Sequence, residues 1–117
     1  MTNKRDDRRE TCAQRVYGRL GQIPVGRVVT YGELARAVHC GSARAMGPIL
    51  RRNPDAPRVP CHRVIRSDGR LGGYQGQSGG RATLRKMQLL EGEGVVFEQG
   101  KLLEPQRIWH FPKTGGA

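Results

Sequence analysis

Cys61 stands directly beside His62, and this pair is the strongest chemical signal in the sequence. A thiol attacks only as the thiolate, and a neighbouring imidazole together with several arginines can lower its pKa. Adjacent residues of an extended segment point in opposite directions, so His62 can reach the Cys61 sulfur only through a bend or a bridging water. The pair indicates nucleophilic chemistry. Taken in isolation it is more often an inert buried cysteine beside a surface histidine.

The other two cysteines, Cys12 and Cys40, indicate no further chemistry. Three cysteines without CxxC spacing predict neither a disulfide framework nor a zinc site. His39 and Cys40 together with His62 also lack the spacing of metal ligands. We therefore expect Cys12 and Cys40 to be buried or idle, and we expect neither a metal nor another cofactor.

The charge of the chain favours a polyanionic partner. Its 117 residues carry 21 Lys and Arg against 10 Asp and Glu, a net charge of +11, which points to nucleic acid first and to an acidic membrane second. Only 5% of the residues are aromatic, too few for the stacking platforms of single-strand binders. No apolar run approaches the ~18 residues that span a bilayer. We therefore expect a soluble protein of the cytoplasm, associated with the nucleoid, or of the nucleus, without a membrane partner.

The chain length fits one domain. Residues 1–10 mix charges of both signs without apolar periodicity, which predicts a disordered tail. The domain itself takes up residues 11–117. Apolar residues at four-residue spacing from Cys12 to Leu20 predict a short amphipathic helix at its start, and Val28 and Val29 predict a short extended piece after it.

Two further helices joined by a tight turn predict a helix-turn-helix. Thr30 and Glu33 have the spacing of a capping box, and a His-Cys-Gly stretch ends the helix that they start after about two turns. Ser42 can cap the next helix, which has a bend or a late start at Pro48. Arg44 lies in this helix among small residues that would let a DNA groove approach closely, namely Ala43, Ala45 and Gly47.

The rest of the chain predicts small β elements and one more helix. Three prolines hold residues 53–60 extended, Asp68 and Gly69 form a turn, and residues 72–80 form a glycine-rich loop. A hairpin follows over residues 95–103. Between them a helix over 81–91 buries Leu84, Met87 and Leu90. The predicted fold is mainly α with small β elements, a winged helix-turn-helix-like single domain.

The string Pro-Cys-His-Arg-Val at 60–64, which follows an Ala-Arg-Ala-Met-Gly helix and an Asn-Pro pair, resembles the O6-alkylguanine-DNA alkyltransferases. The similarity runs from about Val16 to Glu93, through the motifs Thr-Tyr-Gly-Glu-Leu-Ala at 30–35 and Gly-Gly-Tyr at 72–74. The short length and the C-terminal stretch around Trp109 are similar to the alkyltransferase-like proteins, but those carry Trp or Ala where this chain has Cys61.

The resemblance implies a role for each matching residue. Cys61 would accept the alkyl group, His62 would deprotonate it through a water, Glu93 would orient His62, and Asn53 would brace the loop that holds the site. Tyr31 would help to extrude the nucleotide and could donate a proton to the leaving guanine. The further DNA-binding residues would be Ala43, Arg44, Ala45, Gly47, Arg51, Arg52 and Arg63. The substrate pocket would use Val64, Tyr74, Gln75 and Lys86.

Three functions remain open at this point. The first is a DNA alkyltransferase that acts once, because a thioether at Cys61 is not reversed by hydrolysis. The second is a lesion sensor that flips O6-alkylguanine in duplex DNA and recruits excision-repair proteins, with Cys61 silent. In either case we expect a monomer. The third is a helix-turn-helix transcription factor, which leaves the motif at 60–64 unexplained.

Overall fold

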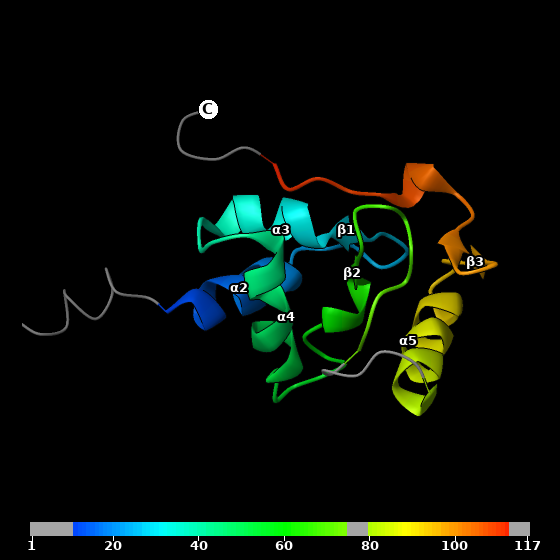
Figure 1. The fold of residues 1–117 in the computed structure, drawn as a ribbon, viewed down its shortest axis with the longest axis horizontal. Coiled ribbons are helices and arrows are strands. Elements are labelled where there is room, and N and C mark those ends of the chain that lie inside the picture. The colour runs from blue at the N-terminus through cyan, green and yellow to red at the C-terminus, as the bar shows by residue number, and fades with distance from the viewer. Residues whose placement is uncertain (1–10, 75–79, 113–117) are drawn as a thin grey trace, which may run out of the picture.

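The computed structural model describes residues 11–74 and 80–112 and shows a mostly helical protein with two very small sheets (Figure 1). The predicted tail at 1–10 and Gln75 of the predicted pocket lie outside the described residues. Within the described residues, no helix is long and apolar enough to cross a membrane.

Helix α2, Cys12–Leu20, opens the described chain. Its N-terminus has a complete capping box, in which Thr11 and Gln14 exchange side-chain-to-backbone hydrogen bonds of 3.0 and 2.8 Å. These bonds satisfy two N–H groups that the helix itself leaves without partners. Val16 and Leu20 face inward and are fully buried, so the apolar spacing predicted this helix correctly.

The predicted helix-turn-helix is formed by α3, Tyr31–Val38, and α4, Ala43–Arg51, which pack against each other. Thr30 accepts a hydrogen bond of 3.1 Å from the Glu33 amide. The other half of the predicted capping box is absent, because the Glu33 carboxylate accepts from the backbone amide of Phe111 at 2.9 Å. Helix α4 begins at Ala43 and continues through Pro48, so the late start considered for this helix does not occur.

The two sheets tie distant parts of the chain together. Strands β1, Val29–Thr30, and β2, Val64–Ile65, pair in parallel and bring the end of the Cys-His motif next to the start of α3. Strands β3, Phe97–Glu98, and β4, Lys101–Leu102, form the predicted hairpin. The Leu102 amide donates to the carbonyl of Gly69 at 2.8 Å, so the hairpin is attached to the turn that follows β2.

Helix α5, Gly80–Gly92, packs on the Cys-His segment from the side opposite the helix-turn-helix (Figure 1). The chain then returns through the short 3-10 helix η2, Pro105–Arg107, to run beside β1, where Val28 forms a bridge with Ile108. Leu90 is fully buried and Met87 is packed against the core, as predicted. Leu84 is 52% exposed, so its predicted burial is wrong.

Two further predictions are corrected by the fold. Residues 54–58 lie in turns rather than in an extended segment, because the Asn53 side chain bonds both the Asp55 amide and the Val59 carbonyl and folds the segment back. Cys12 and Cys40 are not idle, since they form a disulfide that joins the start of α2 to the turn between α3 and α4. Their separation of 28 residues in the sequence gave no local signal for this pairing.

Candidate active site and DNA-binding surface

The reactive motif forms a tight turn. Residues Cys61–Arg63 make the 3-10 helix η1, in which the Arg63 amide donates to the Pro60 carbonyl at 3.0 Å. The extended geometry expected for Cys61 and His62 is therefore wrong. Both side chains are buried, with Cys61 4% and His62 1% exposed. The Cys61 thiol is the free cysteine of the described chain.

Burial sets the resting state of the Cys61 thiol. It raises the pKa of Cys61 above its ordinary value, although hydrogen bonds from Asn53 and Tyr74 and the charge of Lys86 act in the opposite direction. We expected the neighbouring imidazole and arginines to lower this pKa, and that expectation is wrong for the DNA-free protein. Burial is the largest effect on this thiol, and among the described residues the cation that lowers its pKa is Lys86 rather than an arginine. A base must therefore remove its proton when it reacts.

The Asn53 side chain forms two hydrogen bonds in the turn before the motif. Its side-chain amide donates to the Val59 carbonyl at 2.7 Å, and its carbonyl oxygen accepts from the Asp55 amide at 3.0 Å. The Val59 carbonyl in turn accepts from the amide of Cys61 at 2.8 Å. One buried side chain thus fixes the backbone on which Cys61 stands.

His62 and Glu93 meet although 31 positions separate them in the sequence. Nε2 of His62 lies 2.9 Å from a Glu93 carboxylate oxygen. Since a carboxylate only accepts hydrogen bonds, Nε2 carries the proton and Nδ1 holds the lone pair. Burial lowers the pKa of His62 and outweighs the opposing effect of Glu93, so the imidazole is neutral at pH 7. Nδ1 is buried and has no hydrogen-bond partner among the described residues.

Arg63, which we predicted to bind DNA, lies against Glu93 inside the protein. Its guanidinium donates to both carboxylate oxygens of Glu93, at 2.9 and 2.8 Å, and to the carbonyl of Ile23 at 2.7 Å. Its side chain is only 13% exposed. Burial raises the pKa of Glu93, but the hydrogen bonds from Arg63 and His62 outweigh that effect and hold it below its ordinary value. Arg63 thus keeps Glu93 ionised beside the imidazole.

Lys86 is the most unusual residue of the site, because its ammonium group is buried and has no carboxylate partner among the described residues. It donates to the carbonyls of Val64 and Leu71, both at 2.7 Å, and of Gly73 at 2.9 Å. Burial lowers the pKa of Lys86 to about 7, and the nearby Cys61 opposes that shift. The three bonds tie strand β2 to the loop that carries Tyr74.

A cavity of about 640 Å³ opens between the helix-turn-helix and the turn after β2. Four of its lining residues were predicted from the sequence, namely Tyr31, Ala43, Arg44 and Gly47. Arg66 and Ser67 complete the lining and were missed. They directly precede the Asp-Gly turn signal, so the turn could have indicated that the side chains before it project to the surface.

Tyr31 lies where the cavity meets the reactive site. Its ring is 5.8 Å from the ammonium of Lys86. Gly72 has a φ of +77°, and a Cβ there would approach the Tyr31 hydroxyl to 3.5 Å. A glycine at this position therefore lets the loop pass close to the ring. Burial raises the pKa of Tyr31, which keeps the hydroxyl protonated.

Other predicted DNA-binding residues lie along α4. Arg44 is exposed near its start, and Arg51 and Arg52 are exposed at its end. Ala45 is half-buried and packs toward the core rather than lining the cavity. Helix α4 thus presents three arginines on one element, and no carboxylate within the described chain forms an ion pair with any of them.

The family described as 6-O-methylguanine DNA methyltransferase, DNA binding domain, matches residues 11–95. The chain belongs to this family. A methylated-DNA–protein-cysteine methyltransferase of Methanothermobacter thermautotrophicus is 46% identical over 85 residues, which are 73% of this chain and 45% of the relative. A DNA base-flipping protein of Thermus thermophilus is 48% identical over 82 residues, which are 70% of this chain and 52% of the relative. The chain therefore spans about half the length of these curated relatives.

The fold is also similar to that of a solved structure, S. pombe Atl1 in complex with damaged DNA containing O6-carboxymethylguanine. The TM-score is 0.72 with 34% identity, and the match covers 84% of this chain and 94% of Atl1. Family membership and this likeness confirm the resemblance and the helix-turn-helix-like fold predicted from the sequence. The individual roles of the site residues remain predictions.

Proposed function

We propose that this protein binds duplex DNA that contains O6-alkylguanine, extrudes the damaged base and transfers its alkyl group irreversibly to Cys61. The observation that carries the proposal is the arrangement around the thiol. The buried Cys61 directly precedes the buried, neutral His62, and Glu93 orients the imidazole through a hydrogen bond to Nε2. A binding protein has no need of an oriented base beside a free thiol. The names of the relatives support the same chemistry.

The proton of Cys61 leaves through His62. Because Nε2 is committed to Glu93, Nδ1 is the nitrogen that can accept a proton. A water molecule between Sγ and Nδ1 would carry the proton from the thiol to the imidazole. Glu93 stabilises the imidazolium that forms, and Arg63 keeps Glu93 ionised for that purpose. The high resting pKa of the thiol makes this base necessary.

The transfer itself is a displacement at the alkyl carbon. The Sγ–C bond forms while the C–O6 bond breaks, and the electron pair of the broken bond stays on the guanine. Tyr31, whose hydroxyl is protonated, donates a proton to the leaving guanine, which departs neutral. The product at Cys61 is a thioether that hydrolysis does not reverse, so each molecule reacts once.

Base extrusion is required because an O6-alkyl group inside the duplex is out of reach of a protein sulfur. Arg44 lines the cavity beside Tyr31 and is the side chain placed to fill the space that the base leaves. Arg51 and Arg52 extend the positive surface along α4 and would bind phosphates. The solved complexes of Atl1 and of Mycobacterium tuberculosis OGT with DNA support duplex DNA as the partner.

A second candidate is a lesion-binding protein in which Cys61 is silent. The likeness of its fold to Atl1, with a TM-score of 0.72, favours it, because that protein was solved in complex with damaged DNA. In that case the protein would flip and hold the alkylguanine, and excision-repair proteins would remove it. The same cavity and the same arginines would serve both functions.

Intact-mass measurement separates the two functions. We expect one equivalent of O6-methylguanine duplex to add a single methyl mass, located by peptide mapping at Cys61, with no second turnover. Cys61→Ser should bind the duplex and stay unmodified. Binding of lesion duplex by wild-type protein that remains unmodified after prolonged incubation would establish the lesion sensor instead. Failure to prefer lesion duplex over undamaged duplex would contradict both candidates.

A further inference from the structure

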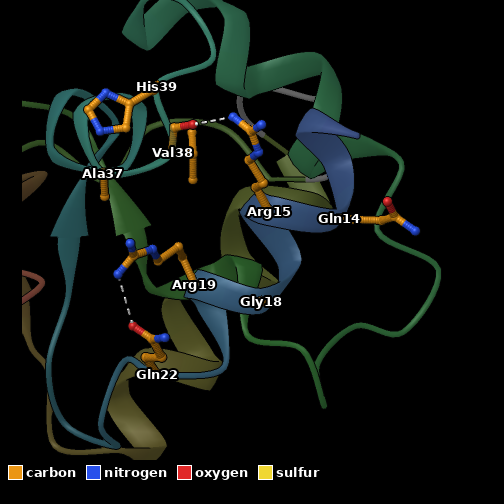
Figure 2. Close-up of a pocket in the computed structure, with 8 residues that line it drawn as sticks. All are labelled: Gln14, Arg15, Gly18, Arg19, Gln22, Ala37, Val38 and His39. Carbon is orange, nitrogen blue, oxygen red and sulfur yellow. Dashed lines mark hydrogen bonds between the residues drawn. The ribbon is translucent and has the colours of Figure 1, made fainter. Parts of the chain in front are cut away.

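A second cavity, of about 460 Å³, lies between the outer face of α2 and the end of α3 (Figure 2). We call it the α2–α3 groove. Gln14, Arg15, Gly18 and Arg19 line it from α2 and Gln22 from the turn after α2, while Ala37 and Val38 line it from α3 and His39 from the C-cap of α3. It shares no residue with the cavity beside Tyr31 and Arg44. Helix α4, which we place against DNA, contributes nothing to it.

The groove carries uncompensated positive charge. Arg15 donates to the Val38 carbonyl at 3.1 Å, and Arg19 lies 3.4 Å from the Gln22 side-chain oxygen and 5.5 Å from the centre of the Phe111 ring. All of these partners are neutral, and none of the described residues that line the groove is acidic. Elsewhere in the described chain many arginines pair with a carboxylate, namely Arg36, Arg58, Arg63, Arg66, Arg70 and Arg107.

Gly18 faces open space in the groove. It lies on α2 between the two arginines, and a Cβ at this position would meet no atom within 4 Å. A glycine in a helix interior costs about 0.5–1 kcal/mol relative to alanine. Nothing in the packing requires that cost, because the space around Gly18 is free. The effect of the glycine is to leave room for a side chain from another molecule beside Arg15 and Arg19.

We infer that the α2–α3 groove is a docking site for an acidic segment of a partner protein. The groove offers carboxylate side chains two arginine guanidinium groups and the side-chain amides of Gln14 and Gln22 as donors. None of its described lining residues is an acid that would repel them. A concave site between two helices accepts single side chains of a peptide, whereas a DNA duplex presents its phosphates on a convex surface. Since α4 is not involved, the partner and the DNA can be bound together. The inference does not depend on alkyl transfer by Cys61.

Gly18 offers a clean test, because a substitution there removes no existing contact. Gly18→Glu places a carboxylate next to Arg15 and Arg19, where it would occupy the arginines and repel an acidic ligand. Gly18→Gln has nearly the same size without the charge and is the matched control. The probe is a fluorescently labelled hexaglutamate peptide, titrated at low salt with undamaged duplex present in saturating amount to occupy α4. Thermal unfolding of both variants checks that α2 is intact.

We expect Gly18→Glu to weaken hexaglutamate binding about fivefold or more relative to Gly18→Gln, the effect of one like charge about 5 Å away near a protein surface. Duplex affinity should agree within about twofold between the two variants, as for a substitution away from the DNA. Equal hexaglutamate affinities would overturn the inference. A specific loss of duplex binding in Gly18→Glu would also overturn it, because the groove would then be a DNA contact. The same holds if hexaglutamate binds in the absence of duplex and this binding is lost when duplex is added.

Discussion

Replacing Arg63 by methionine distinguishes its observed internal role from the DNA-binding role that the resemblance implied. Methionine has a similar length and no charge, so it fills the space but leaves the Glu93 carboxylate without its two guanidinium bonds and the Ile23 carbonyl without a donor. We expect the protein to lose stability and the base His62 to lose its fixed partner. Contacts between α4 and DNA should not change.

The size of the stability loss follows from the burial of the pair. Removing one partner of a buried ion pair lowers the free energy of unfolding by about 3–5 kcal/mol. The Arg63 and Glu93 side chains are 13% and 17% exposed, so water still reaches the Glu93 carboxylate after Arg63 is replaced. We therefore expect a stability loss at the lower end of this range, about 3 kcal/mol. At about 4 °C per kcal/mol for a domain of this size, the Tm should fall by about 12 °C.

Urea unfolding and DNA titration at several salt concentrations provide the measurements. Arg63→Lys keeps the charge and loses the fork, so it should lie between the wild type and Arg63→Met in stability. On undamaged duplex, the slope of log K against log salt should be unchanged in both variants. A stability loss below about 1 kcal/mol, together with a slope reduced by about 0.9, the value for one lost phosphate contact, would refute the internal role.

Three further predictions follow from the site. His62→Ala and Glu93→Gln should each slow alkyl transfer by about 10²-fold in single-turnover assays, and the double variant should be no slower than the worse single variant, because the two residues act as one relay; multiplicative losses would show that they act separately. Arg44→Ala should react at least about tenfold more slowly with a lesion in duplex DNA, because no side chain then fills the space of the extruded base and offsets the cost of unstacking it. With free O6-benzylguanine, which needs no extrusion, its rate should stay within about twofold of the wild type, and an equal loss on both substrates would place Arg44 in the pocket or the fold. Burial lowers the pKa of Lys86 from 10.5 to about 7, so above pH 7 the unfolded chain binds a proton that the folded protein does not; the free energy of unfolding should therefore rise with pH from about 7 to 8.5 by up to about 1.4 kcal/mol per unit relative to Lys86→Met. A parallel pH dependence of the two proteins in urea unfolding would contradict the shift.

The parts of the fold that depend on neighbouring residues were predictable. Helix α2 follows from its apolar spacing, and α3 from the Thr30 cap and the left-handed His39 that ends it. The hairpin follows from Gln99 and Gly100, which both have positive φ. In each case the residue that sets the conformation lies within a few positions of the segment that it controls. The error at residues 54–58 arose because side-chain hydrogen bonds of Asn53 set the conformation of that segment. The error at Leu84 arose because the rest of the described chain leaves this side chain 52% exposed.

By itself, the sequence determined which chemistry is present: a short motif with a cysteine and a histidine, an arginine-rich helix-turn-helix and a net charge of +11. Only the tertiary structure decided what each charged or reactive side chain does. It turned Arg63 inward to Glu93, buried the ammonium of Lys86 among three carbonyls and joined Cys12 to Cys40. It also left Arg15 and Arg19 without an acidic partner in the part of the chain that the structure describes. The reason is physical. The protonation and partners of a group depend on its distance from solvent and from residues remote in the sequence, and the chain brings those together only when it folds.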